Sequence, residues 1–265
     1  MIEGNMDTLK NQFQTEKNSI KRIIGIMSGK GGVGKSTVSV MLADSLINHG
    51  YKVGILDADI TGPSVPSLLK ITEAQLSADQ DNINPFVTPK GLKVVSMNLM
   101  LDDKNQPVAW RGAVLSNVIK QIWTKVNWGE LDYLLIDTPP GTSDIALTVL
   151  QQIHPHGIIL VSVPQDLVQH IVQKTIEMVN QANIKLIGTI LNMSYYTCPC
   201  CGNNFVMYKD TSDTFANHRI IGHLPAVLPL ADLSENKGIL NEETEKLIDP
   251  ITRIIINEVK ISSLP

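Results

Sequence analysis

The ten residues SGKGGVGKST, which begin at Ser28, constrain the fold of this chain more than any other feature. They follow an apolar run at residues 22–27 and precede a segment of helical period at residues 36–48. A G-x4-G-K-S pattern in that setting is typical of a phosphate-binding P-loop between a strand and a helix. Such a match arises by chance in a chain of this length with odds of about 0.01. The motif therefore predicts a nucleotide-binding α/β fold.

The rest of the chain carries the pattern of such a fold. Short runs rich in Ile and Val alternate with segments whose apolar residues recur at i, i+3 and i+4. Most runs are apolar nearly throughout, as expected of strands covered by helices on both faces. We therefore predict a doubly wound α/β fold, with a mostly parallel sheet and helices on both faces. Strands are expected at residues 22–27, 52–56, 92–97, 133–136, 157–163, 185–191 and 219–223, and helices at residues 36–48, 113–126, 143–152 and 167–180.

The remaining segments suggest one elaborated domain. Residues 1–20 are polar and are predicted to form a mobile arm, so that residues 21–265 form the folded domain. Residues 72–90 are polar and are expected to form a surface excursion. Residues 242–259 can form a helix with an apolar stripe, interrupted or bent at Pro250. We expect this helix to pack on the sheet, because its polar face lacks the Lys and Arg of membrane-surface helices.

Composition excludes several classes of protein. The 265 residues are 43% hydrophobic and 18% charged, and the formal net charge is −4, so no overall basic field would attract nucleic acid or a membrane. No apolar run approaches the roughly 20 residues that span a bilayer. Three cysteines are too few for a disulfide framework. The start of the chain lacks the apolar core of a signal peptide, and we predict a cytoplasmic protein.

The P-loop pattern assigns roles to individual residues. Lys35 would reach the β and γ phosphates of a nucleotide, the Ser36 hydroxyl would bind Mg²⁺, and Thr37 would touch the α phosphate. The helix that follows would add the positive end of its dipole. The remaining loop residues expected at the phosphates are Gly29, Lys30, Gly31, Gly32, Val33 and Gly34.

Polar residues after other strands would complete the site. Asp137 in LLIDTPPGTSD is expected to hold Mg²⁺ through water, and Asp57 or Asp59 in GILDADITGPSVP could orient the attacking water. Gly141 would offer a backbone amide to the γ phosphate and release it on hydrolysis. Asn192 follows the strand at residues 185–191, and its amide could pair with adenine; an ordinary strand-ending asparagine is the alternative.

All three cysteines lie between residues 198 and 201, in TCPCCG. The pair Cys198 and Cys201, followed by glycine, is typical of a knuckle that binds one metal centre, with zinc and an iron–sulfur cluster as the main options. A redox dithiol ranks third, because we expect an aromatic and polar loop around the pair rather than the start of a helix. Either metal centre usually needs four ligands, and two chains related by a two-fold axis would supply them. Because Cys200 lies inside this pair, either Cys200 or Cys201 could be the second ligand.

The string GKGGVGKST resembles the deviant P-loop of dimeric ATPases that include MinD, ParA, the arsenite-pump ATPase and the nitrogenase iron protein. This resemblance implies that Lys30 reaches across a dimer to the partner's nucleotide. Together with DADITGPSVP, LLIDTPPGTSD, LNMSYYTCPCCG, AWRG at residues 109–112 and the late segment LPAVLPLADLSENKG, the chain resembles the Mrp/ApbC family of iron–sulfur cluster carrier ATPases. The likeness runs from about residue 21 to about residue 240.

The resemblance implies a homodimer that binds a [4Fe-4S] cluster on bridging Cys198 and Cys201. It further implies ATP and Mg²⁺ as cofactors, slow ATP hydrolysis coupled to cluster transfer, cluster scaffold proteins as partners, and apo iron–sulfur proteins as recipients. Catalysis would involve Lys30, Lys35 and Asp59, with Asp59 orienting the water, and Asn192 would contact the base. The first residues carry no cysteine, so the additional ferredoxin-like cluster of eukaryotic cytosolic relatives is not expected.

Other functions remain open at this stage. A MinD- or ParA-type positioning or partitioning ATPase shares the P-loop. Two features argue against it: such an ATPase does not need the cysteine knuckle, and we find no basic amphipathic end that would bind a membrane or DNA. A dimer stabilised by structural zinc would keep the ATPase without the carrier function. Electron transfer of the nitrogenase type would need a partner reductase.

Overall fold

A computed structural model gives the fold of most of the chain. It describes residues 14–15, 18–59, 64–71, 78–79, 82–97, 125–164, 169–207, 219–226 and 240–260. The AWRG segment, nearly all of the helix expected at residues 113–126, and most of the expected arm at residues 1–20 lie outside these ranges.

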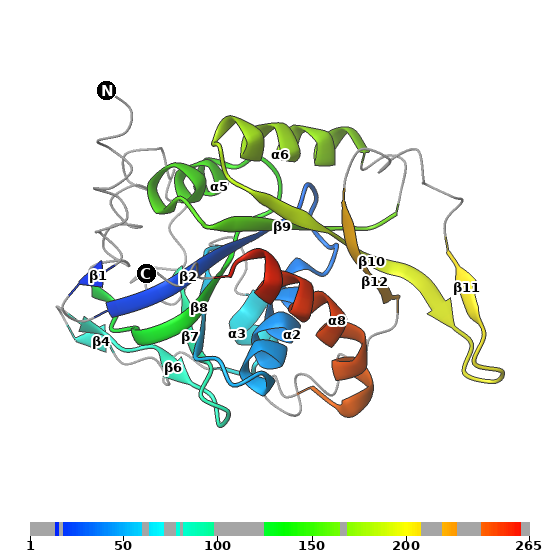
Figure 1. Cartoon of the computed structure of the whole chain (residues 1–265), viewed down its shortest axis with the longest axis horizontal. Coiled ribbons are helices and arrows are strands. Elements are labelled where there is room, and N and C mark those ends of the chain that lie inside the picture. Colours follow the sequence, from blue (N-terminus) through cyan, green and yellow to red (C-terminus); the bar gives the residue numbers. More distant parts are fainter. Residues whose placement is uncertain are drawn as a thin grey trace.

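A ten-stranded sheet forms the centre of the molecule (Figure 1), with β11-β10-β9-β2-β8-β3-β7-β6 as its order. The strands from β10 to β7 in this order are all parallel to their neighbours. At the margins the pairing is antiparallel: β6 pairs with β7, β11 with β10 and β1 with β2. β12 pairs parallel with β10. The strand bounds are β1 Gln14–Thr15, β2 Asn18–Met27, β3 Val53–Asp57, β6 Phe86–Val87, β7 Lys93–Ser96, β8 Gly129–Asp137, β9 Gly157–Ser162, β10 Leu186–Thr197, β11 Asn204–Val206 and β12 Ile220–Pro225, with β4 Ala78–Asp79 and β5 Asn82–Ile83 in a separate two-stranded sheet.

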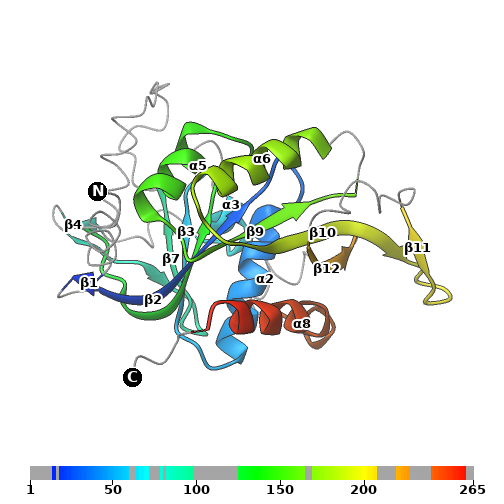
Figure 2. The same cartoon turned by 45° about the horizontal axis from the view of Figure 1, so that its top comes forward.

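Helices cover both faces of this sheet. Figures 1 and 2 show α5 and α6 on one face and α2 and α8 on the other. The central strands are buried on both faces: in β8, Leu134 and Ile136 belong to one apolar cluster and Leu135 to the other. The predicted doubly wound fold, mostly parallel with helices on both faces, is confirmed. The helices are α2 Lys35–Asn48, α3 Ser64–Leu68, α5 Asp144–Thr148, the π-helical turn η3 Val149–Ile153, α6 Gln169–Gln181 and α8 Glu242–Glu258.

Several strands, β2 and β10 among them, extend beyond their predicted bounds. β2 begins at Asn18, within the segment expected to be an arm, because the buried Asn18 side chain donates to the Val126 carbonyl and accepts from the Gly129 N–H. β10 continues to Thr197 and forms a hairpin with β11. The loop expected around Tyr195, Tyr196 and Phe205 is therefore wrong, because cross-strand pairing makes these residues part of the sheet.

The last helix is continuous. α8 runs through Pro250 without an interruption, and a bend at Pro250, the other expectation, stays a prediction. Proline removes one backbone donor, but Ile248, Ile251 and Ile255 on the same helix are buried in the main core, and Asn241 caps the first turn by accepting from the Thr244 N–H. Within the described ranges, no helix combines the length and apolar character required to cross a bilayer.

The excursion expected at residues 72–90 is only partly described. It contains β4, β5 and β6, and β6 forms an edge of the main sheet by pairing with β7. Ile83 and Thr88 are buried, so this part of the segment packs against the domain.

Candidate functional site

The nucleotide-binding pattern lies where β2 ends and α2 begins. The loop after Met27 turns through Gly32 and Gly34, whose φ angles of 78° and 81° favour glycine. Gly34 is the N-cap residue of the 14-residue helix α2, and no side chain caps this end. The first backbone N–H groups of the helix therefore form the kind of end that binds phosphate.

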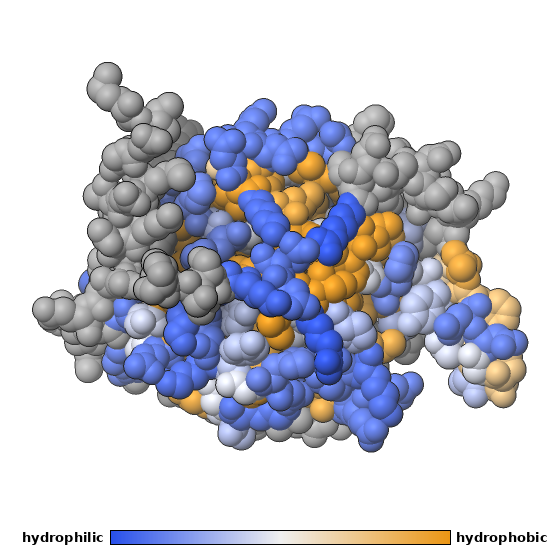
Figure 3. Space-filling view, in the orientation of Figure 1, coloured by the Kyte–Doolittle hydropathy of each residue, from blue (hydrophilic) through white to orange (hydrophobic). Residues whose placement is uncertain are grey.

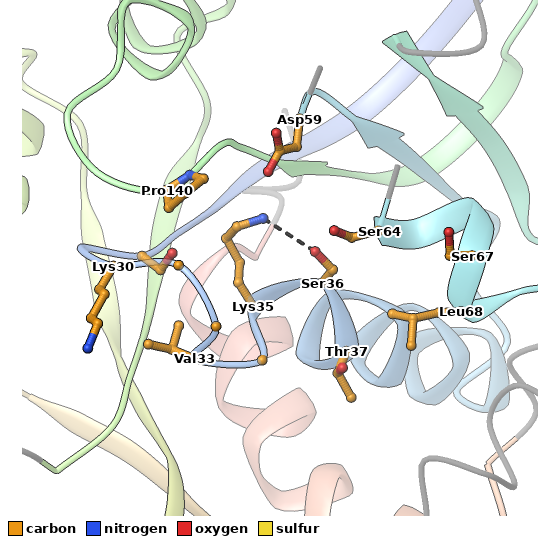
Figure 4. Close-up of a pocket in the computed structure, with 14 residues that line it drawn as sticks. Lys30, Val33, Lys35, Ser36, Thr37, Asp59, Ser64, Ser67, Leu68 and Pro140 are labelled. Carbon is orange, nitrogen blue, oxygen red and sulfur yellow. Dashed lines mark hydrogen bonds between the residues drawn. The ribbon is translucent and has the colours of Figure 1, made fainter. Parts of the chain in front are cut away.

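A cavity of about 610 Å³ opens at this loop. Residues 30–37 line one side, and Asp59, Pro140 and residues of α3 line the other (Figure 4). The volume lies within the range of small-molecule sites, about 300 to 1,000 Å³. Most of the residues predicted to bind the nucleotide thus face one cavity. Those that do not line it are Gly29, Asp57, Asp137, Gly141 and Asn192, and the predicted metal ligands Cys198 and Cys201 lie outside it as well.

Asp137, the last residue of β8, is fully buried behind the loop. Its Oδ1 accepts a hydrogen bond from Ser39 Oγ at 2.8 Å and lies 2.7 Å from Lys35 Nζ. Its Oδ2 accepts from Ser36 Oγ at 2.5 Å, and the Lys35 amine donates to the same hydroxyl at 3.5 Å (Figure 4). A hydroxyl beside a carboxylate is a pair of hard oxygen donors, which fits Mg²⁺.

Asp57 and Asp59 have different surroundings. Asp57 ends β3 beside Asp137, and its carboxylate accepts from the backbone N–H groups of Asp59 at 3.1 Å and Val65 at 3.2 Å. Burial, and then the charge of Asp137, raise the pKa of Asp57 to about 7. Asp59 lines the cavity on the side toward which the Lys35 amine points (Figure 4). Of the two carboxylates, Asp59 is therefore the one that can meet a bound ligand.

The sequence did not indicate how Lys30 and Gly141 are placed. Lys30 is exposed, and its side chain points away from that of Lys35 (Figure 4). Gly141 adopts a φ of 77°, and its N–H donates to the Ser28 carbonyl at 2.7 Å. The amide that was expected at the γ phosphate is thus engaged with the P-loop backbone in this structure.

Asn192 is likewise directed at the loop. It is 2% exposed, and its Nδ2 donates to the Val33 carbonyl at 2.9 Å, across 159 residues of sequence. Among the described residues, its buried Oδ1 has no hydrogen-bond partner. The contact is close: a Cβ added at Gly34 would lie 2.3 Å from Asn192 Nδ2. The predicted contact with adenine stays a prediction.

The cysteines occupy the turn of the β10–β11 hairpin. The Cys198 N–H donates to the Asn203 carbonyl and the Gly202 N–H donates to the Cys198 carbonyl, both at 2.9 Å. All three thiols are free, with Cys198 partly exposed and Cys200 and Cys201 exposed. The backbone N–H groups of Cys201 and Cys200 donate to the Cys198 sulfur and lower its pKa.

This geometry favours a thiolate at Cys198, the form that binds metals. The thiols of both Cys201 and Cys200 also lie within hydrogen-bonding reach of it, so the turn itself does not select between them. Within the described ranges, no group of three or more His, Cys, Asp or Glu side chains is arranged to hold a metal ion.

The hairpin extends beyond the body of the sheet in both views (Figures 1 and 2). Hydrophobic residues are visible at its outer end (Figure 3). Phe205, Val206 and Met207 are 55%, 76% and 50% exposed, and Tyr196 beside them is 39% exposed. The cysteines therefore lie next to an exposed apolar surface.

Some residues of the site escaped the sequence analysis. Ser39, which binds Asp137, lies four residues after Lys35 on α2, and this one-turn spacing could have identified it. Ser64, Ser67 and Leu68 of α3 line the cavity. No sequence signal indicated them, because only tertiary folding brings α3 to the loop.

Comparisons with known proteins find relatives over most of the chain. A family model described as "ParA: NUBPL iron-transfer P-loop NTPase" matches residues 19–259. An iron-sulfur cluster carrier protein of Clostridium perfringens (strain 13 / Type A) is 44% identical over 232 residues, which cover 84% of this chain and 82% of the relative.

Solved structures show the same architecture. A nucleotide-binding protein in complex with ADP, from Archaeoglobus fulgidus, is 36% identical with a TM-score of 0.73, covering 88% of this chain and 91% of that one. The MinC:MinD cell division complex of Aquifex aeolicus contains a chain that is 20% identical with a TM-score of 0.63, covering 92% and 97% respectively. At that identity the second likeness concerns the fold alone.

Proposed function

This chain belongs to the ParA/NUBPL family of iron-transfer P-loop NTPases, and on that premise we propose that it is an ATP-binding, slowly ATP-hydrolysing carrier of an iron–sulfur cluster. It receives a [4Fe-4S] cluster from a scaffold protein, holds it at a homodimer interface and transfers it to apoproteins. The cytoplasm is the proposed compartment, because the three free thiols require reducing conditions.

One observation carries this proposal. Cys198 and Cys201 are free thiols in a projecting hairpin of the same sheet that holds the P-loop cavity. Backbone N–H donors stabilise a thiolate at Cys198, and thiolates are the usual ligands of iron–sulfur clusters. A partitioning ATPase has no need of such a turn, and an exposed thiolate pair suits a cargo that must be released.

ATP binds, in this proposal, with its phosphates at the open end of α2. Lys35 contacts the β and γ phosphates and Thr37 the α phosphate, and backbone N–H groups of residues 29–34 donate to the phosphate oxygens. Mg²⁺ would be held by Ser36 Oγ and, through water, by Asp137, whose carboxylate accepts from that same hydroxyl. When bound, it would supply positive charge that offsets the charge of the phosphates.

Asp59 accepts a hydrogen bond from the attacking water and orients it toward the γ phosphorus. The exposed Lys30 reaches the nucleotide of the partner subunit. The Gly141 N–H leaves the Ser28 carbonyl to meet the γ phosphate, and hydrolysis allows the original hydrogen bond to form again.

A homodimer supplies the cluster ligands. Each chain contributes Cys198 and Cys201, so two chains give the four thiolates that a [4Fe-4S] cluster requires. The exposed Phe205, Val206 and Met207 next to the cysteines would be covered by a partner. Nucleotide state then sets the geometry of the dimer and the exposure of the cluster to recipients.

Anaerobic reconstitution with iron and sulfide tests the carrier function. Wild-type protein is expected to gain visible thiolate-to-iron absorbance. Cys198→Ser and Cys201→Ser are each expected to lose most of it, whereas Cys200→Ser, a matched control in the same turn, is expected to retain it. Transfer is then measured as activation of an apo iron–sulfur enzyme by the reconstituted carrier.

Three results would contradict the proposal. One is the absence of visible absorbance in the wild type. Another is absorbance that persists when both Cys198 and Cys201 are replaced by serine. The third is tightly bound zinc without sulfide, which indicates a structural metal.

A further inference from the structure

A single strand connects the nucleotide loop to the cysteine turn. Residues 187–192 of β10 are buried in the sheet, and the strand then continues to Thr197, directly before Cys198. Asn192 bonds the P-loop at Val33. Only five residues therefore separate Asn192, which contacts the P-loop, from the first cysteine.

The Val33 carbonyl belongs to the same peptide unit as the Gly34 N–H, one of the donors proposed to bind phosphate. The Val33–Gly34 peptide is planar, so the Val33 carbonyl and the Gly34 N–H point in opposite directions and rotate together. When the Gly34 N–H turns toward a phosphate oxygen, the Val33 carbonyl must turn with it. Asn192 Nδ2 holds that carbonyl at 2.9 Å, and within the described part of the chain its Oδ1 has no second anchor. The position of the Asn192 side chain therefore follows the peptide.

β10 is irregular immediately after this contact. Met193 adopts a φ of 54°, which is sparsely populated by residues other than glycine. The register between β10 and β12 shifts between Leu191 and Tyr195, and the Ser194 hydroxyl donates back to the Leu191 carbonyl. A bulge of this kind redirects a strand and loosens its ladder. Beyond the irregular segment β10 pairs with β12 once more, at Tyr195, so a change of direction concerns the outer part of the hairpin, from Tyr196 onward.

We propose that Asn192 is a positioning residue that couples the state of the P-loop to the cysteine turn. The phosphates reorient the Val33–Gly34 peptide, Asn192 moves with the Val33 carbonyl, and the irregular segment at Met193 converts this movement into a new orientation of the β10–β11 hairpin. The inference rests on the proposed function, since it supplies the link by which ATP controls cluster exposure.

Thiol reactivity tests the coupling without a cluster. Reduced apoprotein is alkylated with iodoacetamide at saturating Mg-ADP and at saturating Mg²⁺ with a non-hydrolysable ATP analogue, and modification of Cys198, Cys200 and Cys201 is followed by mass spectrometry. In the wild type the two rates should differ by about fivefold, the bias that one hydrogen bond of about 1 kcal/mol gives between two states. In Asn192→Ala and Asn192→Ser the ratio should fall to about one.

The ratio separates coupling from stability. A variant that merely loosens the fold raises both rates and leaves their ratio unchanged. Thr189→Val is the matched control, because Thr189 is a buried residue of the same strand whose Oγ1 has no partner among the described residues. It should keep the wild-type ratio. Asn192→Ser serves if Asn192→Ala fails to fold, since both side chains are too short to reach Val33.

Two outcomes would overturn the inference: equal rates in the two nucleotide states of the wild type, or an unchanged ratio in the Asn192 variants. Failure of the proposed function is distinguishable, because it shows as the absence of a cluster on reconstitution whatever the alkylation ratio.

Discussion

Gly34→Ala is expected to destabilise the protein by about 2–4 kcal/mol. The φ of Gly34 is 81°, and holding alanine in the left-handed region costs about 1–2 kcal/mol. The new Cβ would also lie 2.3 Å from Asn192 Nδ2, so Asn192 must move and its hydrogen bond to the Val33 carbonyl is lost. That loss adds about 1–2 kcal/mol.

Gly50→Ala is the matched control. Gly50 has a φ of 85°, but no atom lies within 4 Å of a Cβ built there. It should lose only the backbone contribution, about 1–2 kcal/mol. The difference between the two losses of unfolding free energy measures the clash with Asn192. Adding Asn192→Ala to the Gly34→Ala variant should recover part of the free energy lost through this clash.

Urea unfolding of the nucleotide-free protein measures these differences in unfolding free energy. The midpoints can be compared if the variants have similar m-values. Equal destabilisation by Gly34→Ala and Gly50→Ala would refute the close approach of Asn192 to the loop. Failure of Asn192→Ala to relieve the Gly34→Ala defect would refute it as well.

Three further predictions concern charged residues. Lys35→Ala should reduce ATP turnover by at least about 100-fold. It should also lower the free energy of unfolding by about 3–5 kcal/mol, because it leaves the buried Asp137 carboxylate without its cation. Near-normal turnover would contradict the role of Lys35. Lys30→Ala should alter the free energy of unfolding by less than about 0.5 kcal/mol, since Lys30 is exposed. The same variant should lower ATP turnover, and unchanged turnover would show that Lys30 has no role in catalysis. Burial raises the pKa of Asp57 from 3.8 to about 7, so between these pH values the folded protein binds a proton at Asp57 that the unfolded chain does not. The stability that this proton provides is lost as the pH rises from 3.8 to about 7. Asp57→Asn should flatten the pH dependence of the unfolding free energy across this range, and an equally steep dependence in the variant would show that another group titrates.

Much of the fold was predictable because its signals are local. The strands at residues 133–136 and 157–163 were recognised as uninterrupted apolar runs, and both are central parallel strands buried on two faces. The P-loop was recognisable for a similar reason, since its turn and helix start are specified within ten residues.

The deviations arise from contacts between distant segments. The polar start of β2 folds because Asn18 bonds Val126 and Gly129, more than one hundred residues away. The sequence predicts a loop where β10 and β11 form a hairpin, because Tyr195, Tyr196 and Phe205 pair only across the cysteine turn. Neither pairing leaves a periodic signal in the sequence.

The same distinction holds for the site. Ser36 and Asp137 are predictable from the sequence, and the structure brings their side chains within 2.5 Å. The bond between Asn192 and the P-loop is not, because a residue that ends a strand gives no indication of which distant carbonyl it will meet. The different environments of Asp57 and Asp59 likewise depend on tertiary burial.

The most direct test of the carrier function is the composition and mass of protein purified without oxygen. We predict one [4Fe-4S] cluster for every two chains, that is about two iron and two sulfide ions per chain, in a particle with the mass of a dimer of 29.1 kDa chains. Zinc without sulfide, or a cluster bound to a single chain, would contradict the account.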